Sequence, residues 1–367
     1  MAEEEIELLE KVEFRLALAE TDAQLEKILD AFLSPILLKL ASSHEVVRTK
    51  VMSVLTHINK RTRSKNDIKL PLNPLLDLVC TDKVTQSAFV KNFAIIYLEM
   101  AYFRLIEEDK ISNLPNLINN IASKPPALKQ PLFHIILTVL QKFKPKPADS
   151  PSSLDPFNFA ENLNDAKFLL ASFLNVILYN VPQQPKSQLQ QSTGGDSSSG
   201  QQEVSQNLAQ LPPPGMSIKA VKFVTNDGKI QWSERMSDLK LIKLGILRFI
   251  NSTVVLPDSL SEEIHLAKFL ILLVASCDSV NEIVDGGEDG IKKMKRPDME
   301  NIGVVKKLYF LYQGTVNQGS AASTQQETSQ QPASSALKLK IIGYLCRSKL
   351  ATNTFPSMLQ VAFDCLY

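Results

Sequence analysis

Apolar positions near the start of the chain follow the period of two consecutive amphipathic helices. The first helix carries an apolar stripe at Leu33, Ile36, Leu37 and Leu40. The second carries a stripe at Val47, Val51, Val54, Leu55 and Ile58. Residues at these spacings lie on one face of a helix, so each stripe marks a face that is buried on folding. Because a short polar turn separates the stripes, we expect an antiparallel hairpin with Leu55 in its core.

The polar residues of this segment support a hairpin. Ser42 and Ser43 are candidates to cap the second helix. Pro35 lies near the middle of the first helix, where it removes a backbone donor and bends the helix. Arg48, at the start of the second helix, has two interpretations of equal weight: it bonds to polar groups of the neighbouring turn, or it is solvated.

Hairpins of this kind recur about every 40 residues, which is typical of stacked helical repeats. The pattern predicts helices over residues 3–19, 22–41, 74–80, 84–106, 109–122, 126–143 and 157–180. The helix over 84–106 is apolar nearly all round and therefore needs cover on more than one side. The expected fold class is an all-α superhelix, in which each hairpin packs on the next.

Composition changes sharply in two places. Residues 181–216 are rich in Gln, Ser, Pro and Gly and hold no aromatic residue, and residues 313–336 are similar. Neither segment buries enough apolar area to offset its ordering entropy, so both are expected to be disordered inserts. The predicted division is a helical array over 1–180, an insert over 181–216, a hairpin with further repeats over 217–312, an insert over 313–336 and a truncated repeat over 337–367.

One segment has the pattern of strands. Within residues 221–232, Asn-Asp-Gly supplies turn chemistry between KFVT and KIQW, which predicts a small β-hairpin. Helices should resume over 237–251, 259–277, 281–294, 297–312, 337–349 and from 354 onward. The last of these carries an apolar stripe including Met358 and Phe363 with no polar cover, so we expect the chain to stop partway through a longer array.

The sequence holds no constellation typical of catalysis. The histidines, at positions 44, 57, 134 and 265, lie in helical stretches outside any metal-ligand motif, so structural roles are expected. The cysteines, at 80, 277, 346 and 365, form no CxxC pair and are expected to be reduced thiols. We therefore assign no catalytic, cofactor-binding or metal-ligating residue, and expect neither a cofactor nor a small-molecule substrate.

Two further features have competing interpretations. Residues 285–290, Asp-Gly-Gly-Glu-Asp-Gly, are acidic and glycine-rich but lack the ligand spacing of a calcium loop. We expect the glycines to end one helix, and Glu288 and Asp289 to begin the next. The single tryptophan, Trp232, either anchors a partner surface or packs beneath the predicted hairpin, which is the commoner case.

Charge and hydropathy give no indication of nucleic-acid or membrane partners. The formal net charge is +1, which creates no overall field. There are two local basic clusters. The first consists of Lys60, Arg61, Arg63, Lys65 and Lys69, and the second of Lys292, Lys293, Lys295 and Arg296. Neither has interleaved aromatic residues, so we expect both to be solvated loops. The longest apolar runs, 168–179 and 266–275, are shorter than the roughly 20 residues of a membrane span. The opening MAEEEIELLE also differs from a signal peptide.

Several runs resemble one known family. The helix–Pro–turn–Val-Arg order of residues 33–58 resembles a HEAT repeat. The run VEFRLALAETDAQLEKILDAFLSPILLKLASSHEVVRTKVMSVLTHINKR (12–61) is similar to the amino-terminal region of the very large HEAT-repeat proteasome adaptor and scaffold proteins of eukaryotes. Supporting runs are VKFVTNDGKIQWS (221–233), LKLIKLGILRFI (239–250) and the closing SMLQVAFDCL.

The resemblance implies a non-enzymatic superhelix that binds the 26S proteasome, tethers its core and regulatory particles and acts in assembly quality control. It carries over no contact residue. We expect a soluble protein of the cytoplasm and nucleus, without nucleic-acid binding or membrane insertion. Two alternatives stay open at this point: a HEAT-like adaptor for nuclear transport or vesicle trafficking, and an enzyme with an unrecognised helical site.

Overall fold

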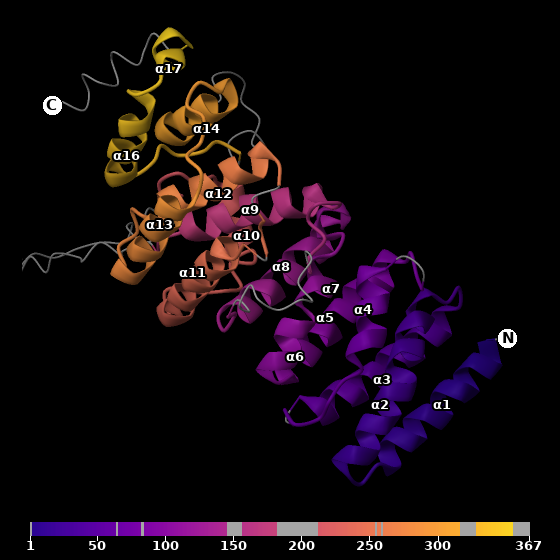
Figure 1. The fold of residues 1–367 in the computed structure, drawn as a ribbon. Helices are drawn as coiled ribbons and strands as arrows, with labels where there is room; N and C mark the ends of the chain where they lie inside the picture. Colours follow the sequence, from indigo (N-terminus) through magenta and orange to yellow (C-terminus); the bar gives the residue numbers. More distant parts are fainter. Residues whose placement is uncertain are drawn as a thin grey trace, which may run out of the picture. The chain divides into compact units, whose positions relative to one another are not determined.

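The computed structural model describes residues 2–63, 65–81, 84–144, 156–181, 212–253, 255–257, 260–315 and 328–354. These residues form helices joined by short connections, and their β pairing is limited to isolated bridges (Figure 1). Two compact units are present: Met1–Phe168 with Arg248–Leu260, and Leu169–Leu247 with Ser261–Tyr367. The predicted all-α fold class is therefore confirmed.

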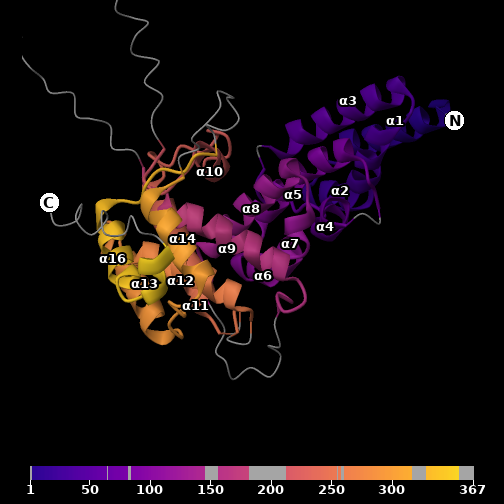
Figure 2. The same ribbon diagram turned by 90° about the horizontal axis from the view of Figure 1, so that it is seen from above.

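The first unit is a stack of helices in two layers. One layer holds α1 (Ala2–Leu18), α3 (Glu45–Thr62), α5 (Ala88–Arg104) and α8 (Pro126–Leu140), each in contact with the next. The other holds α2 (Asp22–Leu38), α4 (Leu72–Cys80) and α7 (Leu114–Ile118) in the same order (Figure 2). Short elements connect them: η1 (Lys39–Ala41), α6 (Glu107–Ser112) and η2 (Ile121–Ser123). Two boundaries between the units fall inside helices, one within α9 (Leu163–Leu178) and one within α11 (Met236–Asn251).

The first hairpin follows the predicted pattern. Every residue of the two apolar stripes is buried. Thr21 and Gln24 form a reciprocal capping box at the start of α2, and Pro35 lies inside that helix. The capping role predicted for Ser42 and Ser43 is wrong, because α3 begins after His44 and has no side-chain cap. Ser42 Oγ instead accepts the His44 N–H, and Arg48 donates to the Ser42 carbonyl over 2.7 Å, as in the first interpretation of Arg48.

Hydrogen bonds between neighbouring helices of one layer reveal the length of the repeat. Tyr97 Oη on α5 donates to the Leu55 carbonyl on α3, 42 positions earlier. Arg104 Nη2 donates over 2.8 Å to the Thr62 carbonyl, also 42 positions earlier. These separations agree with the predicted spacing of about 40 residues, so each side chain bonds to the main chain at the equivalent level of the preceding repeat.

Arginines near the ends of three helices satisfy carbonyls that the α-helix leaves without intrahelical partners. Arg61, in the last turn of α3, donates to the Leu16 and Ala19 carbonyls near the end of α1. Arg104 does the same at the end of α3. Arg248 donates over 2.9 Å to the carbonyl of Gln141, the C-cap of α8. A cation at each C-terminus also complements the helix dipole.

The second unit packs α12 (Glu262–Ala275) against α13 (Asn281–Lys293) and α16 (Ser335–Leu345). The remaining elements are α10 (Ile218–Val224), α14 (Ile302–Gln313) and α17 (Lys349–Thr354). A buried ion pair joins Lys243 to Asp278 at 2.7 Å, and Lys243 also donates to Asn180. Burial lowers the pKa of Lys243, and the carboxylate of Asp278 opposes that shift.

The β-hairpin predicted for residues 221–232 is wrong. Ser217 caps α10, so the KFVT run is helical up to Val224. Asn226, Asp227 and Gly228 do adopt the left-handed conformation expected of turn residues, but they follow a helix instead of joining two strands. Trp232 is buried, and its Nε1 donates over 3.1 Å to the Val224 carbonyl. The prediction that Trp232 is packed in the interior is thus confirmed, but it packs against α10 and not beneath a β-hairpin.

The prediction that the glycines of residues 285–290 end a helix is wrong. These glycines lie inside the continuous helix α13. A Cβ atom at Gly287 would lie 2.7 Å from the Ser276 nitrogen and 2.8 Å from the Leu272 oxygen. Glycine is therefore required where α13 crosses closely over the C-terminal end of α12. This close packing explains Gly287 without a ligand.

The described flanks of the two predicted inserts are bonded to each other, so these flanking residues belong to the fold. The Gly215 N–H donates to the Pro332 carbonyl, and the Gln331 N–H to the Met216 carbonyl. Gln330 also forms isolated bridges with Ser217 and Thr315. We call these contacts and their residues the β junction. Residues 182–211 and 316–327 lie outside the described residues.

Several helix bounds differ from the expected ones. The helix expected over 109–122 divides into α6 and α7, with Pro115 in the first turn of α7. The helix expected over 297–312 begins only at Ile302, where Asn301 supplies the cap. The apolar stripe around Met358 lies outside the described residues.

Candidate interaction surfaces

The structure brings none of the predicted histidines together into a site. His44 precedes α3, His57 lies within it, and His134 and His265 lie on α8 and α12. In the described ranges, no group of three His, Cys, Asp or Glu side chains is arranged to hold a metal ion. No helix among those same residues has the length and apolar character that crossing a membrane requires.

The cysteines differ in exposure, which predicts their reactivity. Burial raises the pKa of the Cys80 thiol to about 11, and burial also raises the pKa of Cys277. Cys346 is exposed. Since the thiolate is the reacting form, iodoacetamide should modify Cys346 before Cys277, and Cys80 last of these three, at neutral pH. The rate at Cys80 should keep rising as the pH approaches 11, as peptide mass spectrometry will show. Equal rates at Cys80 and Cys346 would contradict this order.

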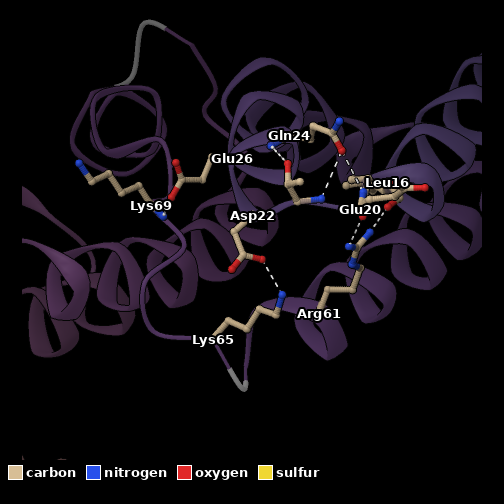
Figure 3. A network of polar contacts seen from close by, with 10 residues as sticks. Leu16, Glu20, Asp22, Gln24, Glu26, Arg61, Lys65 and Lys69 are labelled. Atoms are coloured by element: carbon tan, nitrogen blue, oxygen red, sulfur yellow. Dashed lines mark hydrogen bonds and ion pairs between the residues drawn. The ribbon is translucent and has the colours of Figure 1, made fainter.

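Part of the first basic cluster is bound to α1, α2 and the turn between them (Figure 3). Arg61 bonds to the Leu16 and Ala19 carbonyls, and Lys65 forms an ion pair with Asp22 at 2.5 Å. The Lys69 N–H donates to the Glu26 side chain over 2.7 Å. These contacts, between residues 42 to 45 positions apart, make the segment a connection between repeats. In the second cluster, Lys292 pairs with Asp289 at an exposed position.

An apolar stripe is exposed along α5. Phe89, Ile96 and Phe103 follow each other at intervals of seven residues, so they lie along one side of the helix. Their exposed fractions are 50%, 51% and 59%. Several elements pack on α5, as predicted for a helix that is apolar nearly all round. Among the described residues, however, none of them buries the side that carries Phe89, Ile96 and Phe103. We call these three residues the α5 stripe; a row of exposed large apolar side chains is typical of an interaction surface.

A polar groove of about 630 Å³ lies between α4 and α7, in the opposite layer of the first unit. We call it the amide groove, after its lining by Asn73, Asp77, Asn116, Asn119, Asn120 and Lys124. These residues were not predicted from the sequence. The available signal was the similarity of LNPLLDLV (72–79) to LPNLINNI (114–121), which marks equivalent helices of consecutive repeats.

Buried polar contacts hold the walls of the amide groove. Asp165 is buried, and its two carboxylate oxygens accept the Asn120 and Ala122 N–H groups over 2.7 and 2.8 Å. Lys124 is also buried and donates to the Cys80 carbonyl over 2.6 Å, which joins the end of α4 to the segment after η2. The groove is therefore fixed by contacts between repeats.

Comparison with known proteins identifies the family. Residues 9–367 match the family model described as "Proteasome component ECM29, N-terminal". The chain belongs to this family. The ECM29 family relatives include the human "Proteasome adapter and scaffold protein ECM29", which is 35% identical over 371 residues, covering 100% of this chain. They also include the Drosophila melanogaster "Proteasome-associated protein ECM29 homolog", 31% identical over 98% of this chain, and the Saccharomyces cerevisiae "Proteasome component ECM29", 27% identical over 95%.

The chain spans 19% of the human ECM29 protein and 17% of the fly and yeast proteins. The names of these relatives describe proteasome association, and the name of the human protein also describes an adapter and scaffold role. The resemblance predicted from residues 12–61 is confirmed over almost the whole sequence.

Proposed function

We propose that this protein is a non-catalytic adaptor that binds the 26S proteasome and holds the core and regulatory particles together or monitors their assembly. The observation that carries the proposal is the family match over residues 9–367, with relatives named as proteasome adapters, components and scaffolds. The stacked helical hairpins of the first unit support it, because repeats of this kind present long surfaces to large partners.

The proposed mechanism needs binding and no chemistry. A stack of hairpins that contacts two bodies at once converts their association into an intramolecular event and raises the effective concentration of each for the other. Contacts in the first unit join each hairpin to its neighbour in the chain, as the bonds from Tyr97 to Leu55 and from Arg104 to Thr62 show. Such a stack bends by small adjustments at each junction while keeping its surface continuous.

We assign the α5 stripe as a contact surface for the proteasome, because its three apolar side chains are exposed on a helix that the rest of the unit holds in place. The test is capture of purified 26S proteasome on the immobilised, tagged chain. We expect both particles to be recovered. Replacing Ile96 and Phe103 by Asp should reduce recovery at least about tenfold, since central apolar contacts carry much of the energy of an interface.

The control is Leu339→Asp, which places the same charge on another exposed apolar residue, on α16. It should leave recovery unchanged. If the wild-type chain recovers no proteasome subunit, the adaptor proposal is wrong. If the double variant binds like wild type, the assignment of the α5 stripe is wrong and another surface makes the contact.

The proposed location is the cytoplasm and nucleus, where proteasomes would be accessible to such an adaptor. Imaging of the fluorescently labelled full-length protein tests it, with exclusion from both compartments as the contrary result.

A further inference from the structure

The amide groove is built from equivalent faces of two consecutive repeats. Asn73 and Asp77 lie on exposed positions of α4. Asn116 lies on α7, and Asn119 and Asn120 directly follow that helix. Because α4 and α7 are neighbours in one layer, the groove crosses both helices. A ligand in it would contact both repeats at once.

The lining favours a neutral, hydrogen-bonding ligand. Its side chains are mainly carboxamides and hydroxyls, and none is aromatic, so stacking on nucleic-acid bases has no support here. Of the two charged groups, Lys124 is already bonded to the Cys80 carbonyl. The volume of about 630 Å³ lies within the range of about 300–1,000 Å³ that is usual for binding pockets.

A carboxamide offers one acceptor and two donors, which is the same pair of functions that a peptide bond carries. Two of the groove amides already bond locally, Asn116 to Asn113 and Asn120 to Asn119, through one N–H each. Within the described residues, the carboxamide of Asn73 has no hydrogen-bond partner. Donors and acceptors thus remain on both walls of the groove.

The groove is pre-organised. Asn120 has a φ of 59°, a left-handed conformation that asparagine tolerates better than most residues. The bonds from the N–H groups of Asn120 and Ala122 to Asp165 hold this turn in place. A main chain that is held in place before binding loses less conformational entropy when a ligand arrives.

The spacing suits an extended chain. Helices packed side by side are about 8–10 Å apart, and an extended chain advances about 3.3 Å per residue. About three residues of an extended peptide therefore lead from α4 to α7. We propose that the amide groove binds an extended peptide segment through its main chain, with the carboxamides of Asn73, Asn116 and Asn119 pairing with peptide bonds.

The probe for this proposal is a display library of random, short linear peptides selected on the whole chain. We expect the enriched peptides to share no side-chain motif but to contain less proline than the starting library, because proline lacks the main-chain N–H that a carboxamide would accept. In synthetic copies, N-methylation of a peptide bond that faces the groove should weaken binding about tenfold, because it removes a main-chain donor.

The variant that tests the site is Asn116→Ala with Asn119→Ala. Both side chains are exposed, so the thermal unfolding of the chain should not change. The Kd of the enriched peptides should rise about tenfold or more. The matched control is Asn92→Ala, an exposed asparagine on α5 in the other layer, which should bind the peptides like wild type.

A chemical readout locates the bound peptide. Cys80 lines the groove, whereas Cys346 lies in the second unit. A saturating peptide should slow alkylation of Cys80 and leave that of Cys346 unchanged. The proposal is overturned if no peptide is enriched, if the double variant binds enriched peptides like wild type, or if N-methylation has no effect. None of these results depends on proteasome capture.

Discussion

The Asp278→Asn variant should unfold with a free energy about 3–5 kcal/mol smaller than wild type. The side chains of Lys243 and Asp278 are only 4% and 3% exposed, and their charged atoms are 2.7 Å apart. Asparagine keeps the shape of the side chain and an oxygen for the Val280 N–H, which Asp278 Oδ1 now accepts. It removes the negative charge, so the Lys243 ammonium remains buried without its counter-charge. Urea unfolding at neutral pH measures the loss.

The pH dependence of this variant gives an independent check. Burial lowers the pKa of Lys243, and the neutral carboxamide of the variant would no longer oppose that shift. The unfolded chain then binds more protons than the folded one between the lowered pKa and the ordinary lysine value of 10.5, so stability should rise with pH in that window. A variant that instead loses stability across this window would contradict the buried-cation explanation.

The matched control is Lys240→Gln, one turn before Lys243 on α11. Lys240 pairs with Glu282 at 2.7 Å, but both side chains are well exposed. Surface pairs contribute little because water screens them, so this change should alter the free energy of unfolding by less than about 1 kcal/mol. If Asp278→Asn and Lys240→Gln lose the same free energy of unfolding, burial of the ion pair does not decide how much it stabilises the fold.

The Leu55→Ala variant should lose about 2–5 kcal/mol of stability, the usual range for truncation of a buried leucine. Leu55 is 2% exposed on α3, which packs against α1, and its carbonyl accepts the Tyr97 hydroxyl of α5. The cavity would therefore open where consecutive hairpins contact each other. Hydrogen exchange should show faster opening in α1 and α5 as well as in α3.

Met52→Ala is the control, because Met52 lies on the same helix and is 39% exposed. It should change the free energy of unfolding by less than about 0.5 kcal/mol. If the thermal unfolding midpoint of Leu55→Ala equals those of wild type and of this control, Leu55 does not lie in the core.

The hydrophobic pattern predicted the two buried stripes of residues 33–58 well because their spacing matches the period of a helix. Leu33, Leu55 and their stripe neighbours are buried as expected. The pattern failed at residues 221–232, where β-prone residues are helical because Ser217 caps α10 and Trp232 bonds to its last carbonyl. Such tertiary contacts override local propensity and are not visible in a short window.

The candidate surfaces could be predicted only in part. The apolar character of α5 was evident, but not which of its sides is exposed, because that depends on the helices of neighbouring repeats. The amide groove was missed because its asparagines are spread over two segments and resemble ordinary turn residues. Only the packing of α4 against α7 brings Asn73 near Asn116.

The β junction has a practical consequence for protein engineering. Thr315 and Gln330 are hydrogen-bonded to each other on either side of residues 316–327, so the described residues that flank this segment meet at one point. The entropy of closing a loop grows only with the logarithm of its length, about 0.6 kcal/mol for each doubling. A reporter domain or an affinity tag spliced between these two residues should therefore leave the helices on both sides undisturbed.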